Sequence, residues 1–323
     1  MFNNKTILIT GGSGSFGKAF LSYLVKNYKK IKKIIIFSRD EYKQSELKKK
    51  FPESKHKNLR FFLGDVRDLK RLNLAFRSVD YIVHAAALKQ VDTAEYNPFE
   101  FVNTNIIGAQ NVIEAAIQNK VKKVIALSTD KACSPINLYG ATKLCSDKLF
   151  ISSNNMVPSI NDTSFSVVRY GNVFASRGSV IPYFLKINEE KKPFPLTNPE
   201  MTRFNISMDE AIGTVIWAFK NSKGAELIVP KLKSFRIIDL IYSINSNPKI
   251  KNIGIRPGEK IHEELISMSD SRNTIDIGKY YLILADEKMF KKYKKFKTLK
   301  KDFIYRSDLN TQWLSKKDLK NMF

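Results

Sequence analysis

The sequence predicts an α/β fold in which a doubly wound parallel sheet carries a smaller, discontinuous lobe. Three observations predict it. Short apolar runs alternate with helix-length segments in the first half of the chain, and a glycine-rich turn joins the first run to the first helix. After Tyr170 the alternation stops and turn residues become frequent. The length of 323 residues and the hydrophobic content of 43% allow a sizeable core.

The apolar runs of the first half have the length of buried strands. They are Thr6–Thr10, Lys33–Phe37, Leu59–Leu63, Tyr81–His84, Val124–Ser128 and Phe165–Arg169. Helices are expected between them, for example over Phe16–Tyr28 and Asn105–Gln118. Strands that alternate with helices in this way form a parallel sheet covered on both faces, which is the Rossmann arrangement.

The second half is expected to contribute to both parts of the molecule. A helix at Met208–Phe219 and a strand at Glu226–Val229 resume the earlier pattern, and segments rich in Pro and Gly flank them. We therefore expect a nucleotide-binding domain and a smaller substrate-binding lobe. The domain is assigned to 1–172 with 204–229 returning to it, and the lobe to 173–203 and 230–323.

The chain is strongly basic. Lys and Arg number 55 against 31 Asp and Glu, a formal net charge of +24 at pH 7. This charge suits nucleic acid, an anionic membrane or a phosphorylated substrate, but most lysines occupy positions typical of a solvated surface. In the densest run, 288–301, the aromatic residues Phe290, Tyr293 and Phe296 fit amphipathic packing at least as well as base stacking. No nucleic-acid partner is expected.

Cysteine and histidine are scarce. The two cysteines, Cys133 and Cys145, suit a reducing compartment, and three histidines without ligand spacing predict no metal site. No apolar stretch is long enough to span a bilayer, and a strand beginning at Thr6 leaves no room for a signal peptide. We expect a cytoplasmic protein without membrane insertion.

The turn after the first predicted strand has the spacing of a dinucleotide-binding loop. Gly11, Gly14 and Gly17 form G-x-x-G-x-x-G, and Gly12 with the last two also forms G-x-G-x-x-G. Glycine allows a sharp turn and close approach to a pyrophosphate, and the following helix directs free N–H groups at the phosphates. Glycine turns are common, but this one joins a strand to a helix. The expected cofactor contacts are Gly11, Ser13, Gly14, Ser15, Phe16 and Gly17.

The end of the second predicted strand indicates which dinucleotide is bound. Ser38 and Arg39 stand there, and a guanidinium favours the 2′-phosphate of NADP. Asp40 keeps NAD possible. Ser38 with Glu41 also fits a capping box, in which case Arg39 is merely solvated.

The ends of the next two strands supply further expected cofactor contacts. Asp65 and Val66 follow the third strand, where the carboxylate suits the adenine amino group. Ala85 and Ala86 follow the fourth, where small side chains let the backbone lie against a flat ring. Close helix packing is the other explanation for the alanines.

A hydroxyl residue and a Tyr/Lys pair suggest a redox site. Thr129 ends the fifth predicted strand, and Tyr139 and Lys143 lie one helical turn apart and so on one face. A nearby ammonium lowers the pKa of tyrosine, which would make Tyr139 a usable base with Thr129 orienting the reacting hydroxyl.

Thr10–Gly17 with Tyr139–Lys143 resembles the extended short-chain dehydrogenase/reductase superfamily. A closer resemblance is to the inverting UDP-N-acetylglucosamine 4,6-dehydratases, which begin pathways to pseudaminic acid and related amino sugars. The segments that carry it extend from Thr6 to the region of Trp313. They are 37–41, 84–89, 94–98, 127–131, 137–150, 168–173, 176–179 and 255–260.

This resemblance implies a complete reaction cycle. Tyr139 would take the proton of the sugar 4-hydroxyl while hydride leaves carbon 4 for NADP. Lys131, with a pKa lowered by burial and neighbouring positive charge, would remove the carbon 5 hydrogen. Asp130 would protonate the departing 6-hydroxyl, and hydride would return to carbon 6. A local ion pair or a helix cap is the alternative for Asp130 and Lys131.

The resemblance also implies the remaining contacts. Those expected for the UDP-sugar are Lys89, Asn172, Arg177, Arg203, Arg256 and Glu259. Those added for the cofactor are Lys89, Tyr139, Lys143 and Val173. Relatives are homo-oligomers, so an oligomer is expected. Two other functions remain open, an NAD(P)-dependent 4-epimerase, which needs no Asp130–Lys131 pair, and a non-catalytic NADP-binding regulator.

Overall fold

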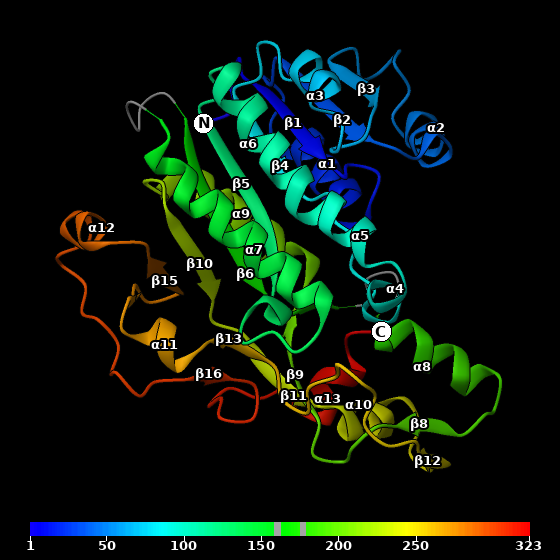
Figure 1. Ribbon diagram of the computed structural model, residues 1–323. Coiled ribbons are helices and arrows are strands. Elements are labelled where there is room, and N and C mark those ends of the chain that lie inside the picture. The colour runs from blue at the N-terminus through cyan, green and yellow to red at the C-terminus, as the bar shows by residue number, and fades with distance from the viewer. Residues whose placement is uncertain (158–162, 175–178) are drawn as a thin grey trace.

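A nine-stranded sheet forms the centre of the computed structural model, which describes residues 1–157, 163–174 and 179–323 (Figure 1). The strand order is β14-β15-β10-β6-β5-β4-β1-β2-β3. The parallel strands are β1 (Thr6–Thr10), β2 (Lys33–Ser38), β3 (Leu59–Leu63), β4 (Tyr81–His84), β5 (Lys123–Thr129), β6 (Ser164–Tyr170) and β10 (Glu226–Pro230). The doubly wound α/β fold is therefore confirmed, and every predicted strand is present.

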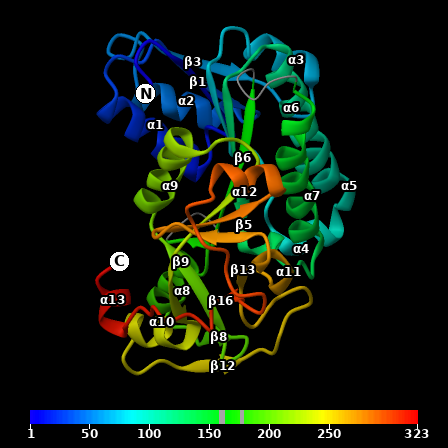
Figure 2. The same ribbon diagram turned by 90° about the vertical axis from the view of Figure 1, so that its left-hand side faces the viewer.

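Helices cover both faces of this sheet (Figure 2). The helices α1 (Ser15–Asn27) and α9 (Met208–Asn221) contact each other on one face. On the other face α3 (Leu69–Ala75), α6 (Gly108–Gln118) and α7 (Leu138–Ser152) pack side by side. The helix α2 (Glu41–Lys50) follows β2 and lies on the same side of the sheet as α1 (Figure 2).

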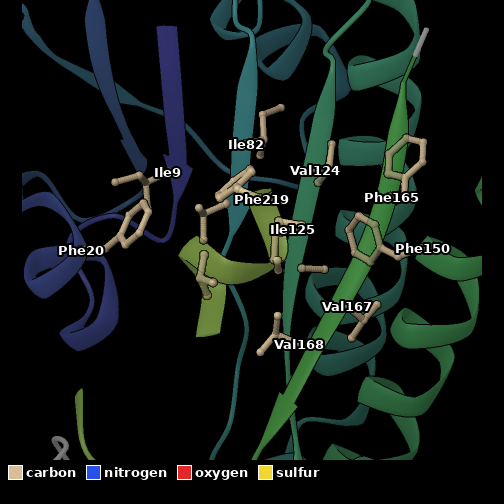
Figure 3. Packing of buried hydrophobic residues seen from close by; sticks show 14 of the residues in the cluster. Ile9, Phe20, Ile82, Val124, Ile125, Phe150, Phe165, Val167, Val168 and Phe219 are labelled. Atoms are coloured by element: carbon tan, nitrogen blue, oxygen red, sulfur yellow. The ribbon is translucent and has the colours of Figure 1, made fainter. Parts of the chain in front are cut away.

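Buried strand residues meet helix residues in the main core (Figure 3). Phe20 comes from α1, Phe150 from α7 and Phe219 from α9. The strands contribute Ile9, Ile82, Val124, Ile125, Phe165, Val167 and Val168. Burying such a side chain contributes about 1.5–3 kcal/mol, so this core fixes the positions of the strand ends that carry the polar residues.

A short irregular segment precedes α6. The helices α4 (Val91–Tyr96) and α5 (Pro98–Phe101) lead into one π-helical stretch, Val102–Ile107, rather than directly into an α-helix. Asn105 lies in this stretch. Its carboxamide oxygen accepts the backbone N–H of Leu88 at 2.9 Å, and its amide nitrogen donates to the Leu88 carbonyl at 3.0 Å. The same amide donates to the Thr142 hydroxyl of α7 at 3.1 Å, so the π-helical turn ties the loop after β4 to α7.

The smaller lobe lies below the carboxyl ends of the strands in Figure 1 and has its own apolar core. Phe184, Phe194, Phe235 and Leu240 are buried in it. Its helices are α8 (Val180–Glu189), α10 (Ile237–Ile244) and α13 (Lys316–Lys320). Its strands are β7 (Asn172–Val173), β8 (Phe194–Leu196), β9 (Thr202–Ile206), β11 (Lys233–Arg236), β12 (Ile250–Asn252), β13 (Glu264–Ile266) and β16 (Tyr305–Arg306).

The late part of the chain does not belong wholly to this lobe. The sequence assigned all of 230–323 to it, but β14 (Thr274–Asp276) and β15 (Tyr280–Leu284) join the main sheet. β15 pairs antiparallel with β10 and so covers backbone groups that would otherwise form an open sheet edge. The short helices α11 (Met268–Ser271) and α12 (Glu287–Lys292) flank these strands.

The aromatic residues of the basic run 288–301 pack inward. Tyr293 is buried and donates a hydrogen bond to Glu226 at 2.8 Å, and Phe290 and Phe296 pack against the main core. Their rings therefore serve packing rather than presenting a stacking surface. Of the helices described, none is long and apolar enough to cross a membrane.

Candidate active site

The glycine loop between β1 and α1 is closely packed against the loop after β4. Gly11 has a φ of +64°, and a Cβ there would lie 2.8 Å from the backbone of Ala85 and Ala86. A Cβ at Gly17 would lie 2.5 Å from the Cα of Gly12. Gly14 precedes α1 and has no side chain to occupy the first N–H groups of the helix. These features fit a cradle for the diphosphate of a dinucleotide.

The end of β2 presents an arginine beside an acidic residue. Arg39 is about half exposed, and its Nη1 lies 3.4 Å from Oδ2 of Asp65. The alternative of a capping box is wrong, because Asp40 caps α2 by accepting the backbone N–H of Lys43 at 2.9 Å. Ser38 is buried instead, and its hydroxyl accepts the Gln44 amide at 3.0 Å.

Asp65 has a partner that the sequence did not indicate. The Nε and Nη2 of Arg67 lie 3.0 and 2.8 Å from its Oδ2. Burial alone would raise the pKa of Asp65, but the hydrogen bonds from Arg67 and the charge of Arg39 outweigh burial and lower it. The carboxylate is therefore ionised and shared between two arginines at the edge where an adenosine is expected. Val66, next to it, is buried.

The end of β4 is held by a buried histidine. The Nδ1 of His84 lies 2.8 Å from the hydroxyl of Thr10, which also accepts the backbone N–H of Ala86. Burial, together with the charge of Lys143, lowers the pKa of His84 to about 3, so the imidazole is neutral. This pair fixes the loop that carries Ala85 and Ala86 against the glycine turn.

Tyr139 and Lys143 lie one turn apart on α7, and both are buried. Burial raises the pKa of Tyr139 to about 12, although the charge of Lys131 and a hydrogen bond with Thr129 act to lower it. That Lys143 also supplies a lowering charge stays a prediction. Its ammonium donates to the Leu127 carbonyl at 2.9 Å, and burial lowers its own pKa.

The helix α7 begins at a residue that also contacts the smaller lobe. The carboxamide oxygen of Asn137 accepts the backbone N–H of Gly140 at 2.8 Å and caps the helix. Its amide nitrogen donates to the Gly258 carbonyl at 2.8 Å. The residue that starts the tyrosine helix thus also binds the Pro257-Gly258 turn of the lobe.

The end of β5 brings three consecutive polar residues into one cluster. Asp130 is fully buried, and its Oδ1 accepts the Thr129 hydroxyl at 3.0 Å and the Lys131 ammonium at 3.1 Å. Burial raises the pKa of Asp130, the charge of Glu263 raises it further, and Lys131 opposes both. Its Oδ2 has no hydrogen-bond partner among the described residues.

The Lys131 ammonium is shared between two carboxylates. Its Nζ lies 3.0 Å from Oε1 of Glu263, in addition to its contact with Asp130. Burial alone would lower the pKa of Lys131, but the two carboxylates outweigh burial and raise it. The expected lowering is therefore wrong, because positive neighbours were foreseen and the carboxylate of Glu263 was not.

Four of the six expected substrate residues line one cavity of about 1090 Å³ between the two parts of the molecule. Arg203 is buried in its wall, where its Nη1 donates to the carbonyls of Thr202 and Ile261 and its Nη2 lies 3.6 Å from Glu259. Burial and the charge of Lys131 lower the pKa of Lys89. Besides Arg203, the expected substrate residues that line the cavity are Asn172, Arg256 and Glu259, and the expected base Lys131 and cofactor contact Val173 line it too.

Two further expectations from the sequence concern Arg177 and metal ligands. Arg177 lies outside the described residues. Within 1–157, 163–174 and 179–323, no group of three His, Cys, Asp or Glu side chains could hold a metal ion. Sequence reasoning missed Glu263, although the acidic pair Glu263-Glu264 closely follows the Arg256–Lys260 segment that it did single out.

Comparison with known proteins gives the chain its family. Residues 7–285 match the family model described as polysaccharide biosynthesis protein. A relative from Campylobacter jejuni serotype O:23/36 (strain 81-176), named UDP-N-acetylglucosamine 4,6-dehydratase (inverting), is 50% identical and covers 99% of this chain and 97% of its own. A relative from Rickettsia prowazekii named UDP-glucose 4-epimerase is 43% identical and covers 100% of this chain and 96% of its own.

Solved structures agree with this assignment. Pen from Bacillus thuringiensis superposes with a TM-score of 0.90 at 39% identity, covering 100% of this chain and 98% of its own. DesIV from Streptomyces venezuelae, a dTDP-glucose 4,6-dehydratase solved with NAD and TYD, shares the fold at 20% identity and a TM-score of 0.69, covering 79% of this chain and 86% of its own. With a family match over most of its length and a half-identical relative that spans it, the chain belongs to the polysaccharide biosynthesis protein family of extended short-chain dehydrogenases/reductases.

Proposed function

We propose that the protein is an NADP-dependent UDP-N-acetylglucosamine 4,6-dehydratase that inverts carbon 5 of the sugar. The observation that carries the proposal is the contact between Asp130 and Lys131 beside Thr129, at the wall of a cavity large enough for a nucleotide sugar. An elimination needs an acid and a base close together, and a simple epimerase does not need this pair. The name of the 50% identical relative supports the same reaction.

The larger α/β body is proposed to hold the cofactor and the smaller lobe to cover the sugar nucleotide. The glycine loop and the start of α1 would bind the diphosphate, and Arg39 would bind the 2′-phosphate that distinguishes NADP from NAD. Lys89, Lys143 and Val173 are proposed as further contacts. A nicotinamide bound there would supply the hydride chemistry of the cycle.

Tyr139 is the proposed base for the first step. It would take the proton of the sugar 4-hydroxyl, which Thr129 would orient. Burial opposes the phenolate, and the charge of Lys131 with the Thr129 hydrogen bond favours it. Lys131 thus contributes to the oxidation site as well as to the elimination site.

Lys131 must lose a proton before it can act as the base at carbon 5, since an ammonium has no free electron pair. Its Nζ lies 3.1 Å from Oδ1 of Asp130, within reach of a direct proton transfer. Moving one proton from Nζ to Oδ1 breaks an N–H bond, forms an O–H bond and leaves the charge of the pair unchanged. The same transfer produces the neutral amine that removes the carbon 5 hydrogen and the carboxylic acid that protonates the departing 6-hydroxyl.

The cavity supplies the proposed sugar-nucleotide contacts. Arg256 is exposed at its wall and is the proposed cation for the diphosphate. Arg203 is engaged by backbone carbonyls and by Glu259, so its proposed part is to shape the wall beside Lys131. Asn172, Lys89 and Glu259 are proposed for polar groups of the substrate, as is Arg177, which lies outside the described residues.

One experiment tests the function. The purified protein is incubated with UDP-N-acetylglucosamine, and the product is followed by proton NMR. A dehydratase yields a carbon 6 methyl signal and a 4-keto sugar, and in deuterated water the label appears at carbon 5.

The second candidate is a 4-epimerase, which the names of the Rickettsia relatives favour. An epimerase yields the 4-epimer of the sugar with carbon 6 unchanged. Formation of the epimer alone would overturn the dehydratase proposal, and bound NADP without turnover of any UDP-sugar would favour a regulator.

A further inference from the structure

Glu263 reaches the elimination site from the smaller lobe, far from Lys131 in the sequence. Its backbone is held firmly just before β13. The N–H of Glu263 donates to the Ser307 hydroxyl at 3.0 Å, and the N–H of Ser307 donates to the Glu263 carbonyl at 2.8 Å. The Ser307 hydroxyl also bonds Thr202 of β9 at 2.6 Å. The carboxylate therefore starts from a fixed backbone position.

The Glu263 side chain is 3% exposed and lines the same cavity as Lys131. Its Oε1 lies 3.0 Å from the Lys131 Nζ and 3.7 Å from the Arg203 Nε. Its Oε2 is buried without a hydrogen-bond partner among the described residues. A buried carboxylate in this state is costly unless a cation compensates it, and Lys131 is the nearer of its two cations.

We propose that Glu263 is a positioning residue of the elimination site, which holds the Lys131 ammonium beside Asp130 and sets the pH range in which this pair carries its single catalytic proton. The proposal rests on the dehydratase function and adds a third side chain to it. Glu263 is not required to exchange a proton with the substrate.

The charged and titratable groups around this cluster come from several elements. Asp130, Glu263 and Arg203 act on Lys131. Lys131 in turn acts on Lys89 and Tyr139, and Arg203 and Lys260 also act on Glu263. Glu263 raises the pKa of Lys131 and also that of Asp130, because a negative charge favours the protonated form of both neighbours. Arg203 opposes the effect on Lys131.

Because Glu263 raises the pKa values of both Asp130 and Lys131, its charge affects the pH dependence of elimination. Asp130 and Lys131 titrate as a pair, and the active form holds one proton between them. Acid adds a second proton and alkali removes the last one, so activity falls on both sides. Removing the charge of Glu263 lowers both apparent pKa values, which moves both limbs of the profile to lower pH. A close charge shifts a pKa by about one unit or more, so the optimum should move by about one pH unit.

The test uses the full chain with Glu263→Gln, which keeps an acceptor of similar shape and removes the charge. Glu264→Gln is the matched control, since the same charge is lost one residue along and the Glu264 carboxylate bonds Ser134 instead. The first measurement is the pH profile of water loss. The second is the rate at which an amine-reactive acylating agent labels Lys131 at pH 9, read by mass spectrometry of its peptide.

The labelling measurement needs no turnover. Only the neutral amine reacts, so each unit by which the pKa of Lys131 falls should raise its labelling rate several-fold, although less than tenfold because a less basic amine is a weaker nucleophile. Glu263→Gln should show this increase, and Glu264→Gln should label at the wild-type rate. If wild type does not release water, the dehydratase proposal fails while the labelling result still decides whether Glu263 controls Lys131.

Two results would overturn the proposal: a folded Glu263→Gln enzyme with both pH limbs unmoved, or one with wild-type labelling of Lys131. If Glu263→Gln does not fold, Glu263→Asp replaces it, because this variant keeps the charge but withdraws it by one methylene. Its rate of water loss should fall and its optimum should move to lower pH by less than about one unit, and an unchanged rate and optimum would contradict the positioning role.

Discussion

Replacing Lys131 by methionine removes the cation from between two buried carboxylates and leaves a side chain of similar length. We expect Lys131→Met to bind the cofactor and the sugar nucleotide. It should fail to release water and to exchange the carbon 5 hydrogen with solvent deuterium, since no amine remains to take that hydrogen. The variant thus separates the elimination role of Lys131 from binding.

The same change should lower stability by a pH-dependent amount. Breaking a buried ion pair costs about 3–5 kcal/mol. With an unfolding entropy of about 2.1 cal/mol/K per residue, this corresponds to a fall in Tm of about 4–7 °C for a chain of this length. Asp130 can relieve part of the loss by taking a proton, so the figure applies at the alkaline end of the range.

The sign of the pH dependence follows from Asp130. Burial and the charge of Glu263 both raise its pKa in the folded protein, and the variant loses the opposing charge of Lys131. A carboxyl whose pKa is raised on folding binds more protons in the folded state, so stability falls as pH rises from its unfolded pKa of about 4 toward the folded value. The deficit of Lys131→Met should therefore be small near pH 5 and larger near pH 8.

The assay pairs a melting curve at several pH values with proton NMR of UDP-N-acetylglucosamine in deuterated water. Lys123→Met is the matched control, because Lys123 begins the strand whose other end carries the site. Its ammonium donates to the carbonyls of Phe219 and Ser222, so its loss should lower Tm without affecting exchange. Normal carbon 5 exchange in folded Lys131→Met would refute the elimination role, and a deficit independent of pH would refute the electrostatic account of the cluster.

Two other substitutions probe the oxidation and the cofactor. Tyr139→Phe should keep the fold and the cofactor because the ring remains, but the loss of the hydroxyl should slow the first oxidation by more than about tenfold. The absorbance of the reduced nicotinamide in a single turnover measures this rate. A rate closer to that of wild type would exclude Tyr139 as the base. The supernatant of heat-denatured wild type should contain a nicotinamide dinucleotide with a 2′-phosphate. Arg39→Ala should weaken NADP binding about tenfold or more and change NAD binding little, and calorimetry measures both affinities. NAD alone in the wild-type supernatant would contradict the assignment of Arg39.

Much of the fold could be predicted because its signals are local. The strands of the parallel sheet appear as apolar runs, and the glycine spacing marks the turn from β1 to α1. The one-turn spacing of Tyr139 and Lys143 likewise predicts their common face on α7. Such patterns depend on residues close together in the chain, for which helix and strand periodicity are sufficient.

The return of the chain to the sheet could not be predicted in this way. β15 follows β10 by about fifty residues and pairs antiparallel with it. Nothing in its own pattern distinguishes an edge strand of the large sheet from a strand of the smaller lobe. The free edge of β10 decides its place, and that edge exists only once the sheet has formed.

The sequence by itself determined which groups could do chemistry, namely Thr129, Asp130, Lys131, Tyr139 and Lys143. Only the tertiary structure decided their charge states. Lys131 is held protonated by Asp130 and by Glu263, which lies 132 positions away in the chain, and Lys143 is bound to a backbone carbonyl of β5. The pKa of a buried group is set by whatever charges and dipoles the fold brings within a few ångströms of it, and local sequence carries no record of residues that arrive from another lobe.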